Sequence, residues 1–100
     1  MEPGERVYHI TTGAQDLERI LLTDDTASRA NIMLKDAKLL VGREGYYIRI
    51  VGTEEQLKRV DELLKDKARL VEGEELKEVL AKIREEDERA LSGFGGIFTE

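Results

Sequence analysis

Two segments of the chain, forty positions apart, share one order of apolar and polar residues. A strand-like run at 7–11 leads into an amphipathic segment at 14–20, and a similar run at 47–51 leads into 54–60. The matching pairs are Ile10 and Ile50, Leu17 and Leu57, and Arg19 and Arg59. Since alternating residues indicate a strand and i, i+3, i+4 spacing indicates a helix, each half is predicted to begin as a strand followed by a helix.

A related hexapeptide closes each half, at 37–42 and at 68–73, and we predict a strand from each. The connection that leads to the first hexapeptide is longer than the connection that leads to the second. We interpret the additional residues as a helix cap followed by a second helical stretch. A short strand at 31–35 is the alternative, because its run of apolar residues fits both structures.

Start signals support the two repeated helices. Thr12 with Gln15, and Thr53 with Gln56, have the spacing of a capping box, in which each side chain satisfies a free backbone amide. A third helix is predicted from about residue 74 to residue 91. Its apolar stripe consists of Leu76, Val79, Leu80 and Ile83. Asp87 interrupts this stripe, so we expect the last turns to be solvated.

Strand, helix, strand, strand, helix, strand is the order of the ferredoxin-like βαββαβ sandwich, which the sequence resembles at the level of architecture. We therefore predict one α+β domain over 1–91, with a four-stranded antiparallel sheet, two helices on one face and an added C-terminal helix. The strands at 6–11 and 47–51 should form the central pair. ACT-type regulatory domains and RRM-type RNA binders share this layout, so the resemblance implies a fold and not a function.

The composition excludes some kinds of functional site and argues against some kinds of partner. The chain has no cysteine and one histidine, which excludes disulfides, thiolate metal ligands and multi-histidine zinc sites. The net charge of −6 argues against a nucleic-acid partner, because nonspecific binding to phosphates needs a basic field. No apolar run is long enough for a membrane span, and we expect a soluble cytoplasmic protein without metal or cofactor. Charges of both signs are interleaved, as in many heat-adapted proteins.

Strand alternation predicts one candidate face. Tyr46, Ile48 and Ile50 should face the two repeated helices together with Tyr8 and Ile10. The opposite face would then gather His9, Tyr47 and Arg49, beside Val7 and Val51. Such side chains could stack a base or hold a carboxylate or phosphate. The alternative is that the third helix, or a second subunit, covers this face.

Residues 92–100 are predicted to form a glycine-rich apolar tail. Phe94, Ile97 and Phe98 lie among glycines, and such residues favour docking onto the domain or onto a neighbouring subunit. Runs of acidic residues, among them Asp24–Asp25 and 85–88, lack the spacing of a calcium-binding loop. We interpret these runs as solvated helix starts and helix faces.

These observations favour a non-enzymatic module, because no catalytic constellation is recognisable in the sequence. We expect it to self-associate and to bind a protein partner or a small ligand in a regulatory or interaction role. The alternative is an RRM-like single-stranded RNA-binding domain that uses His9, Tyr47 and Arg49. An enzyme that relies on carboxylates and the single histidine ranks third.

Overall fold

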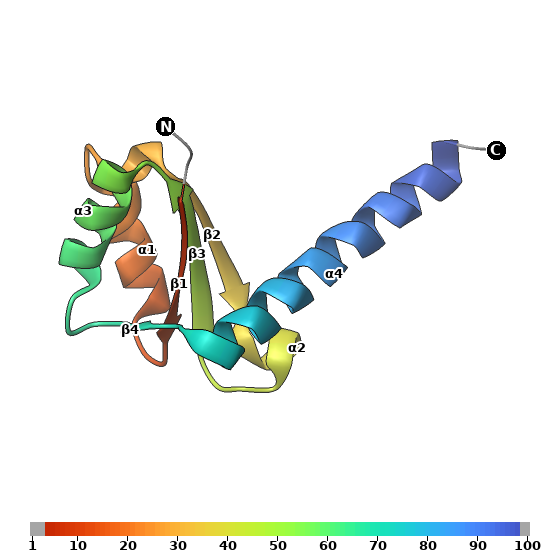
Figure 1. The fold of residues 1–100 in the computed structure, drawn as a ribbon, viewed down its shortest axis with the longest axis horizontal. Coiled ribbons are helices and arrows are strands. Elements are labelled where there is room, and N and C mark those ends of the chain that lie inside the picture. The colour runs from red at the N-terminus through yellow and green to blue at the C-terminus, as the bar shows by residue number, and fades with distance from the viewer. Residues whose placement is uncertain (1–3, 99–100) are drawn as a thin grey trace.

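Four antiparallel strands in the order β2-β3-β1-β4 form one sheet with helices on both faces (Figure 1). The computed structural model describes the backbone of residues 4–98 and the side chains of residues 4–88. The strands are β1 Gly4–Ile10, β2 Asn31–Asp36, β3 Tyr46–Gly52 and β4 Arg69–Leu70. The helices are α1 Ala14–Thr23, the 3-10 turn η1 Ala27–Arg29, α2 Ala37–Val41, α3 Glu54–Leu64 and α4 Gly73–Phe98. None of the helices in this described part of the chain is long and apolar enough to cross a lipid bilayer.

The α+β class and the four-stranded antiparallel sheet are as predicted. Strands β1 and β3 are adjacent at the centre of the sheet, in a register that pairs Gly4 with Gly52 and Ile10 with Tyr46. Strand β2 pairs with the other side of β3, and the two-residue β4 pairs with β1. The two repeated strands therefore form the central ladder that the sequence indicated.

The first half of the chain differs from its predicted structure. Residues 31–36 form strand β2, so the helical interpretation of this stretch is wrong and the strand alternative is correct. The hexapeptide at 37–42 is not a strand, because its first five residues form α2. The Asp36 side chain accepts hydrogen bonds from the backbone amides of Lys38 and Leu39, and so starts this helix. Gly42, with φ of 77°, ends it in the left-handed conformation.

The two predicted capping boxes have different outcomes. Thr53 accepts from the Gln56 amide, and the Gln56 side chain accepts in turn from the Thr53 amide, so α3 begins with a capping box as predicted. At the start of α1, Gly13 occupies the capping position with φ of 72° and no side chain caps the helix. The capping role predicted for Thr12 is therefore wrong, although the helix begins where the sequence indicated.

The first core layer lies between the sheet and the pair α1 and α3. Strands β1 and β3 contribute the side chains that were predicted to face these helices. The buried members of this layer are Tyr8, Ile10, Ala14, Leu17, Leu21, Ala27, Ile48, Ile50, Leu57, Val60 and Leu64. Tyr8 also donates a hydrogen bond to Asp61 Oδ1 at 2.9 Å, which joins β1 to α3.

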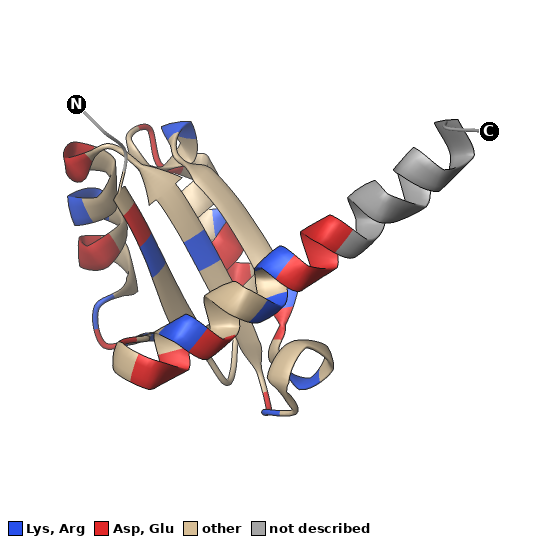
Figure 2. Ribbon diagram, turned by 45° about the vertical axis from the view of Figure 1, so that its right-hand side comes forward, with Lys and Arg blue, Asp and Glu red and all other residues tan. Residues whose placement is uncertain are grey.

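The second core layer lies on the opposite face, under α4 and α2. Its buried members are Val7, Ala37, Leu40, Tyr47, Val71, Val79 and Ile83. Helix α4 runs from the β4 side of the sheet across to the β2 side and continues beyond it (Figures 1 and 2). The helix is longer than the stretch predicted at 74–91, and its bounds include most of the segment predicted as a tail. The side chains of Phe94, Ile97 and Phe98 lie outside the described residues.

Candidate functional site

A polar network lies where the first turns of α4 meet the sheet. His9 comes from β1, Tyr47 from β3, Arg69 from β4, Glu75 from α4 and Arg43 from the turn before β3. These five side chains form a connected set, in which hydrogen bonds link each residue to at least one other member. The network thus joins titratable side chains from five separate parts of the fold.

Tyr47 lies at the centre of this network. Its side chain is fully buried beneath α4, and its hydroxyl donates to Glu75 Oε2 at 3.1 Å. The same hydroxyl accepts from Arg43 Nη1 at 3.1 Å. Burial raises the pKa of Tyr47, because the ionised form would lose its hydration. The hydroxyl is therefore a satisfied neutral group within the core, and the ring is not a surface on which a base can stack.

Glu75 connects the network to α4. Its carboxylate accepts two hydrogen bonds from the guanidinium of Arg69, both at 2.9 Å, and lies 3.5 Å from Arg43. The bond to Arg69 is the main reason that the pKa of Glu75 lies below its usual value. The same bond raises the pKa of Arg69. This paired geometry gives a stronger and more directional contact than a single surface ion pair.

His9 lies at the exposed rim of the network. Its Nε2 is 2.8 Å from the carbonyl oxygen of Glu44, so this nitrogen carries a proton and donates it. In the neutral ring Nδ1 then accepts, and Arg69 Nη2 lies 3.4 Å from it. The His9 ring packs against Tyr47 with centroids 5.0 Å apart and a tilt of 38°. The histidine therefore joins the turn before β3 to the edge strand β4.

Arg49 is separate from this network, although the sequence placed it on the same face. Its guanidinium pairs with Glu5 on the neighbouring strand β1. The two residues line a cleft of about 90 Å³ between the sheet and α4, whose other lining residues are Leu80, Ile83, Arg84 and Asp87. Of the three residues predicted to cluster, the structure brings together His9 and Tyr47 only. The covering of Tyr47 by α4 corresponds to the alternative in which the third helix lies over this face.

Three members of the network were not predicted from the sequence. Arg43, Arg69 and Glu75 come from a turn, an edge strand and a first helical turn, and no periodic spacing relates them. The two acidic residues in the first turn of α4 were visible as a helix-start signal, but the signal does not distinguish Glu75 from Glu74.

The acidic pair at 24–25 also has a local explanation. Asp24 Oδ1 accepts from Arg59 Nε at 3.0 Å and from Arg59 Nη2 at 2.9 Å. Its second oxygen accepts from the backbone amides of Thr26 and Ala27. The hydrogen bond from Arg59 lowers the pKa of Asp24. Asp24 thus fixes η1 against α3. Its side chain is only 14% exposed, so the prediction that this acidic run is solvated is wrong for Asp24.

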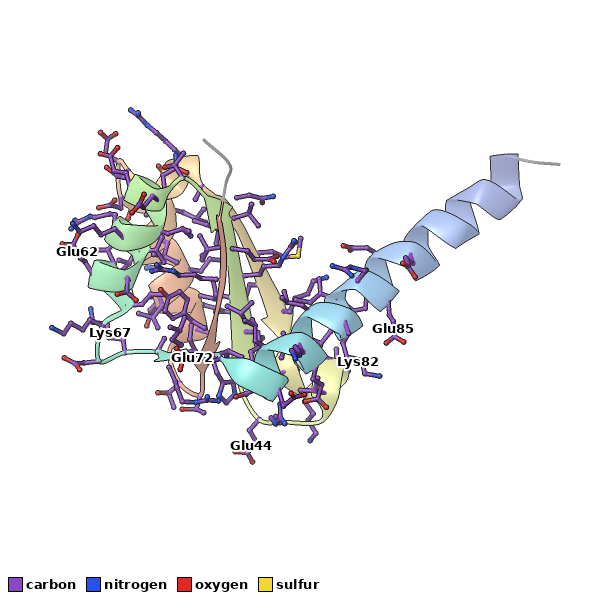
Figure 3. All side chains as sticks on the ribbon, in the orientation of Figure 1. Glu44, Glu62, Lys67, Glu72, Lys82 and Glu85 are labelled. Atoms are coloured by element: carbon purple, nitrogen blue, oxygen red, sulfur yellow. The ribbon has the colours of Figure 1, made fainter. Side chains whose placement is uncertain are left out.

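The polar side chains of these two sites are bonded to one another. Within the described side chains, no three His, Cys, Asp or Glu residues are close enough to hold a metal ion, and no buried polar side-chain atom lacks a hydrogen-bond partner. Arg43 and Arg69 both face carboxylates, so they do not form a free anion site. Figure 2 shows Lys and Arg interspersed with Asp and Glu along α3 and the first turns of α4. The labelled side chains of Glu62, Lys67 and Glu85 point away from the layers (Figure 3).

This arrangement identifies the network as the attachment of α4 to the sheet. A stacking site for RNA would need Tyr47 to be accessible, and α4 covers it. No protein-family model matches the chain, and neither a curated protein nor a solved structure matches it significantly.

Proposed function

We propose that this protein is a non-enzymatic interaction module of ferredoxin-like topology that self-associates through the outer half of α4. Self-association would present the domain to a protein partner or small ligand in a regulatory role. One observation carries this proposal: α4 runs from Gly73 to Phe98, but its last buried residue among the described side chains is Ile83. The backbone of the helix therefore continues well past Ile83.

The ferredoxin-like assignment is supported by the order of the elements. Two βαβ units, β1-α1-β2 and β3-α3-β4, supply a sheet in the order β2-β3-β1-β4, and α1 and α3 pack on one face of it. Helices α2 and α4 are additions to this plan. They close the other face, which two helices alone would leave open.

The inner half of α4 accounts for the packing within the domain. Val79 and Ile83 are buried against the second face of the sheet, and Leu76 and Leu80 are partly buried beside them. From Arg84 to Glu88 the side chains are exposed, except for the half-buried Glu86. A helix rises 1.5 Å per residue, so the backbone from 84 to 98 extends roughly 20 Å beyond Ile83, the last buried residue among the described side chains.

The sequence of the outer half has the spacing of a helix–helix seam. Leu76, Leu80 and Ile83 are separated by four and three residues, and the same alternation continues through Asp87 to Ala90, Phe94 and Ile97. Alternating steps of three and four are the pattern of paired helices. One polar residue in such a seam, here Asp87, can select the register and the number of chains. We infer that a second copy supplies the surface for Phe94 and Ile97.

The test is sedimentation equilibrium of the full chain and of a variant with Phe94→Glu and Ile97→Glu. We expect a dimer for the wild type, and a monomer for the variant with an unchanged circular dichroism spectrum. Glu88→Gln is the matched control, because it alters an exposed position of the same helix and should leave the dimer intact. A full chain that remains monomeric at about 100 µM, far above the micromolar range of weak specific complexes, would contradict the proposal.

A further inference from the structure

The outer edge of β2 has free backbone groups. Strand β2 pairs with β3 in a continuous register, and the amide of Ala37 donates to the carbonyl of Gly45 at 2.9 Å in the next position of that register. In an antiparallel ladder, residues that bond to the neighbouring strand alternate with residues that face away from it. Ile32 and Leu34 therefore direct their amides and carbonyls away from β3. Within the described part of the chain, no hydrogen bond satisfies these groups.

This edge lacks the features that usually protect an edge strand. It has no proline and no bulge, and it is six residues long. Its two charged side chains are both engaged elsewhere. Lys35 pairs with Glu86 of α4 at 3.2 Å, and Asp36 caps α2. The opposite edge is different, because β4 has two residues only.

We propose that β2 pairs antiparallel with β2 of a second copy of this chain, about a twofold axis at Met33. The inference rests on the self-association proposed above and names the second contact that joins the two copies. An antiparallel strand is its own complement under a twofold axis, so one surface serves both subunits. The two four-stranded sheets then form one continuous sheet, and the free groups of Ile32 and Leu34 gain partners.

The chemistry of the side chains selects this register. An axis at Met33 places Ile32 opposite Leu34 of the second copy and Asn31 opposite Lys35, which pairs apolar with apolar and polar with polar residues. It also leaves Asp36 free to cap α2. An axis at Leu34 would instead place the Asp36 carboxylate opposite Ile32 of the second copy.

The direction of α4 agrees with this geometry. Helix α4 leaves the domain past β2, so its outer half lies on the side of the molecule where the second copy would pair (Figure 1). Glu86 ties each α4 to Lys35 of its own strand. In the proposed register the two Lys35 residues lie four positions apart along the ladder, about 13 Å, so the two helices pass on opposite sides of the axis. Strand pairing and the α4 contact then belong to one interface.

Single cysteines in the full chain test the pairing directly, because the natural sequence has no cysteine. Met33→Cys would lie opposite its own counterpart in a pair with Cα atoms about 4.5 Å apart, within the range that a disulfide spans. We expect mild oxidation to convert most of this variant to a covalent dimer. Asn31→Cys is the control, because its counterpart would lie about 13 Å away and should give no cross-link.

A second experiment removes one of the backbone hydrogen bonds proposed between the two β2 strands. Leu34→Pro deletes an outward amide without loss of a bond to β3, and Leu34→Ala controls for the lost side chain. We expect the dissociation constant of the proline variant to exceed that of the alanine variant at least tenfold. A monomeric wild type overturns this inference and the proposed function together. A wild-type dimer that gives no cross-link at position 33 overturns the strand pairing alone, and leaves self-association through α4 in place.

Discussion

Substitution of Glu75 tests whether the polar network fixes α4 to the sheet. The Glu75 side chain is 19% exposed and accepts three hydrogen bonds, two from Arg69 and one from the hydroxyl of Tyr47. In Glu75→Ala, the Tyr47 hydroxyl retains only Arg43, which is itself a donor, so the hydroxyl proton has no acceptor. A buried group left unpaired costs about 1–3 kcal/mol, and we expect a loss of about 2 kcal/mol in the free energy of unfolding.

The assay is urea and thermal unfolding followed by circular dichroism. For a domain of this size, a loss of 1 kcal/mol lowers Tm by roughly 4–8 °C, so the variant should melt about 10 °C or more below the wild type. Glu74→Ala is the matched control. Glu74 occupies the same first turn, its side chain is 93% exposed, and its ion-pair partner is Lys77 at 3.6 Å. The control should lose less than about 1 kcal/mol, the value of a helix-end charge.

The difference in stability between the wild type and Glu75→Ala should depend on pH in a defined direction. The pKa of Glu75 is lowered in the folded state, so its ion pair stabilises the fold above the ordinary value of 4.5 and ceases to do so as the pH falls. The gap in stability between wild type and Glu75→Ala should therefore narrow in acid. Equal stability of the Glu75→Ala and Glu74→Ala variants at neutral pH would refute the reasoning, and so would a gap that stays constant down to about pH 3.

Three further predictions concern single positions in the fold. Burial raises the pKa of Tyr8 to about 12. The neutral Tyr8 hydroxyl therefore stabilises the fold fully below about pH 10, and this stabilisation is lost as the pH rises through 12. Tyr8→Phe should remove the ionisation of Tyr8 from an alkaline titration followed by ultraviolet absorbance. Gly45→Ala should cost more than about 3 kcal/mol in urea unfolding, because φ is +92° and the new Cβ would lie 2.3 Å from a backbone oxygen of β1, whereas Gly13→Ala, in open space, should cost about 1–2 kcal/mol. Thr53→Ala should lose about 1 kcal/mol by the same assay, and Thr12→Ala should change little, because Thr53 caps α3 whereas the Thr12 side chain does not cap α1.

Local signals account for the parts of the fold that the sequence predicted correctly. The alternation in β1 and β3, and the stripes of α1 and α3, reflect residues that contact neighbours at fixed spacing. The capping box at Thr53 needs only four consecutive residues. Each of these features can be recognised without knowledge of the rest of the chain.

The hexapeptide at 37–42 is a segment whose structure local signals do not determine. Its apolar residues fit a strand or a helix equally well, and contacts outside the segment select the helix. Ala37 and Leu40 are buried against α4, and Asp36 satisfies two free amides at the start. The hexapeptides at 37–42 and 68–73 are similar in sequence but differ in structure, because only the later one contributes a strand.

The residues of the candidate site depend on long-range contacts even more than the structure of this hexapeptide does. The face of His9 and Tyr47 followed from strand alternation, but the partners Arg43, Arg69 and Glu75 reach it from three other elements. Arg49 shares that face and still points to another partner, Glu5, across the ladder. Sequence spacing assigns a residue to a face, whereas ion-pair partners depend on where separate elements meet.

The strength of the attachment of α4 decides which surfaces are available for contacts. A helix that served as a removable lid over a binding face would have few polar ties to that face. Glu75 instead fastens the first turn of α4 to β3 and β4, Val79 and Ile83 bury its next turns, and Glu86 ties it to β2. The face beneath α4 is therefore core, which argues against its use as an RNA platform. In the described structure the edge of β2 has free backbone groups, and the backbone of α4 continues past β2 on the same side of the molecule. This is why we propose a second copy of the chain as the partner for both.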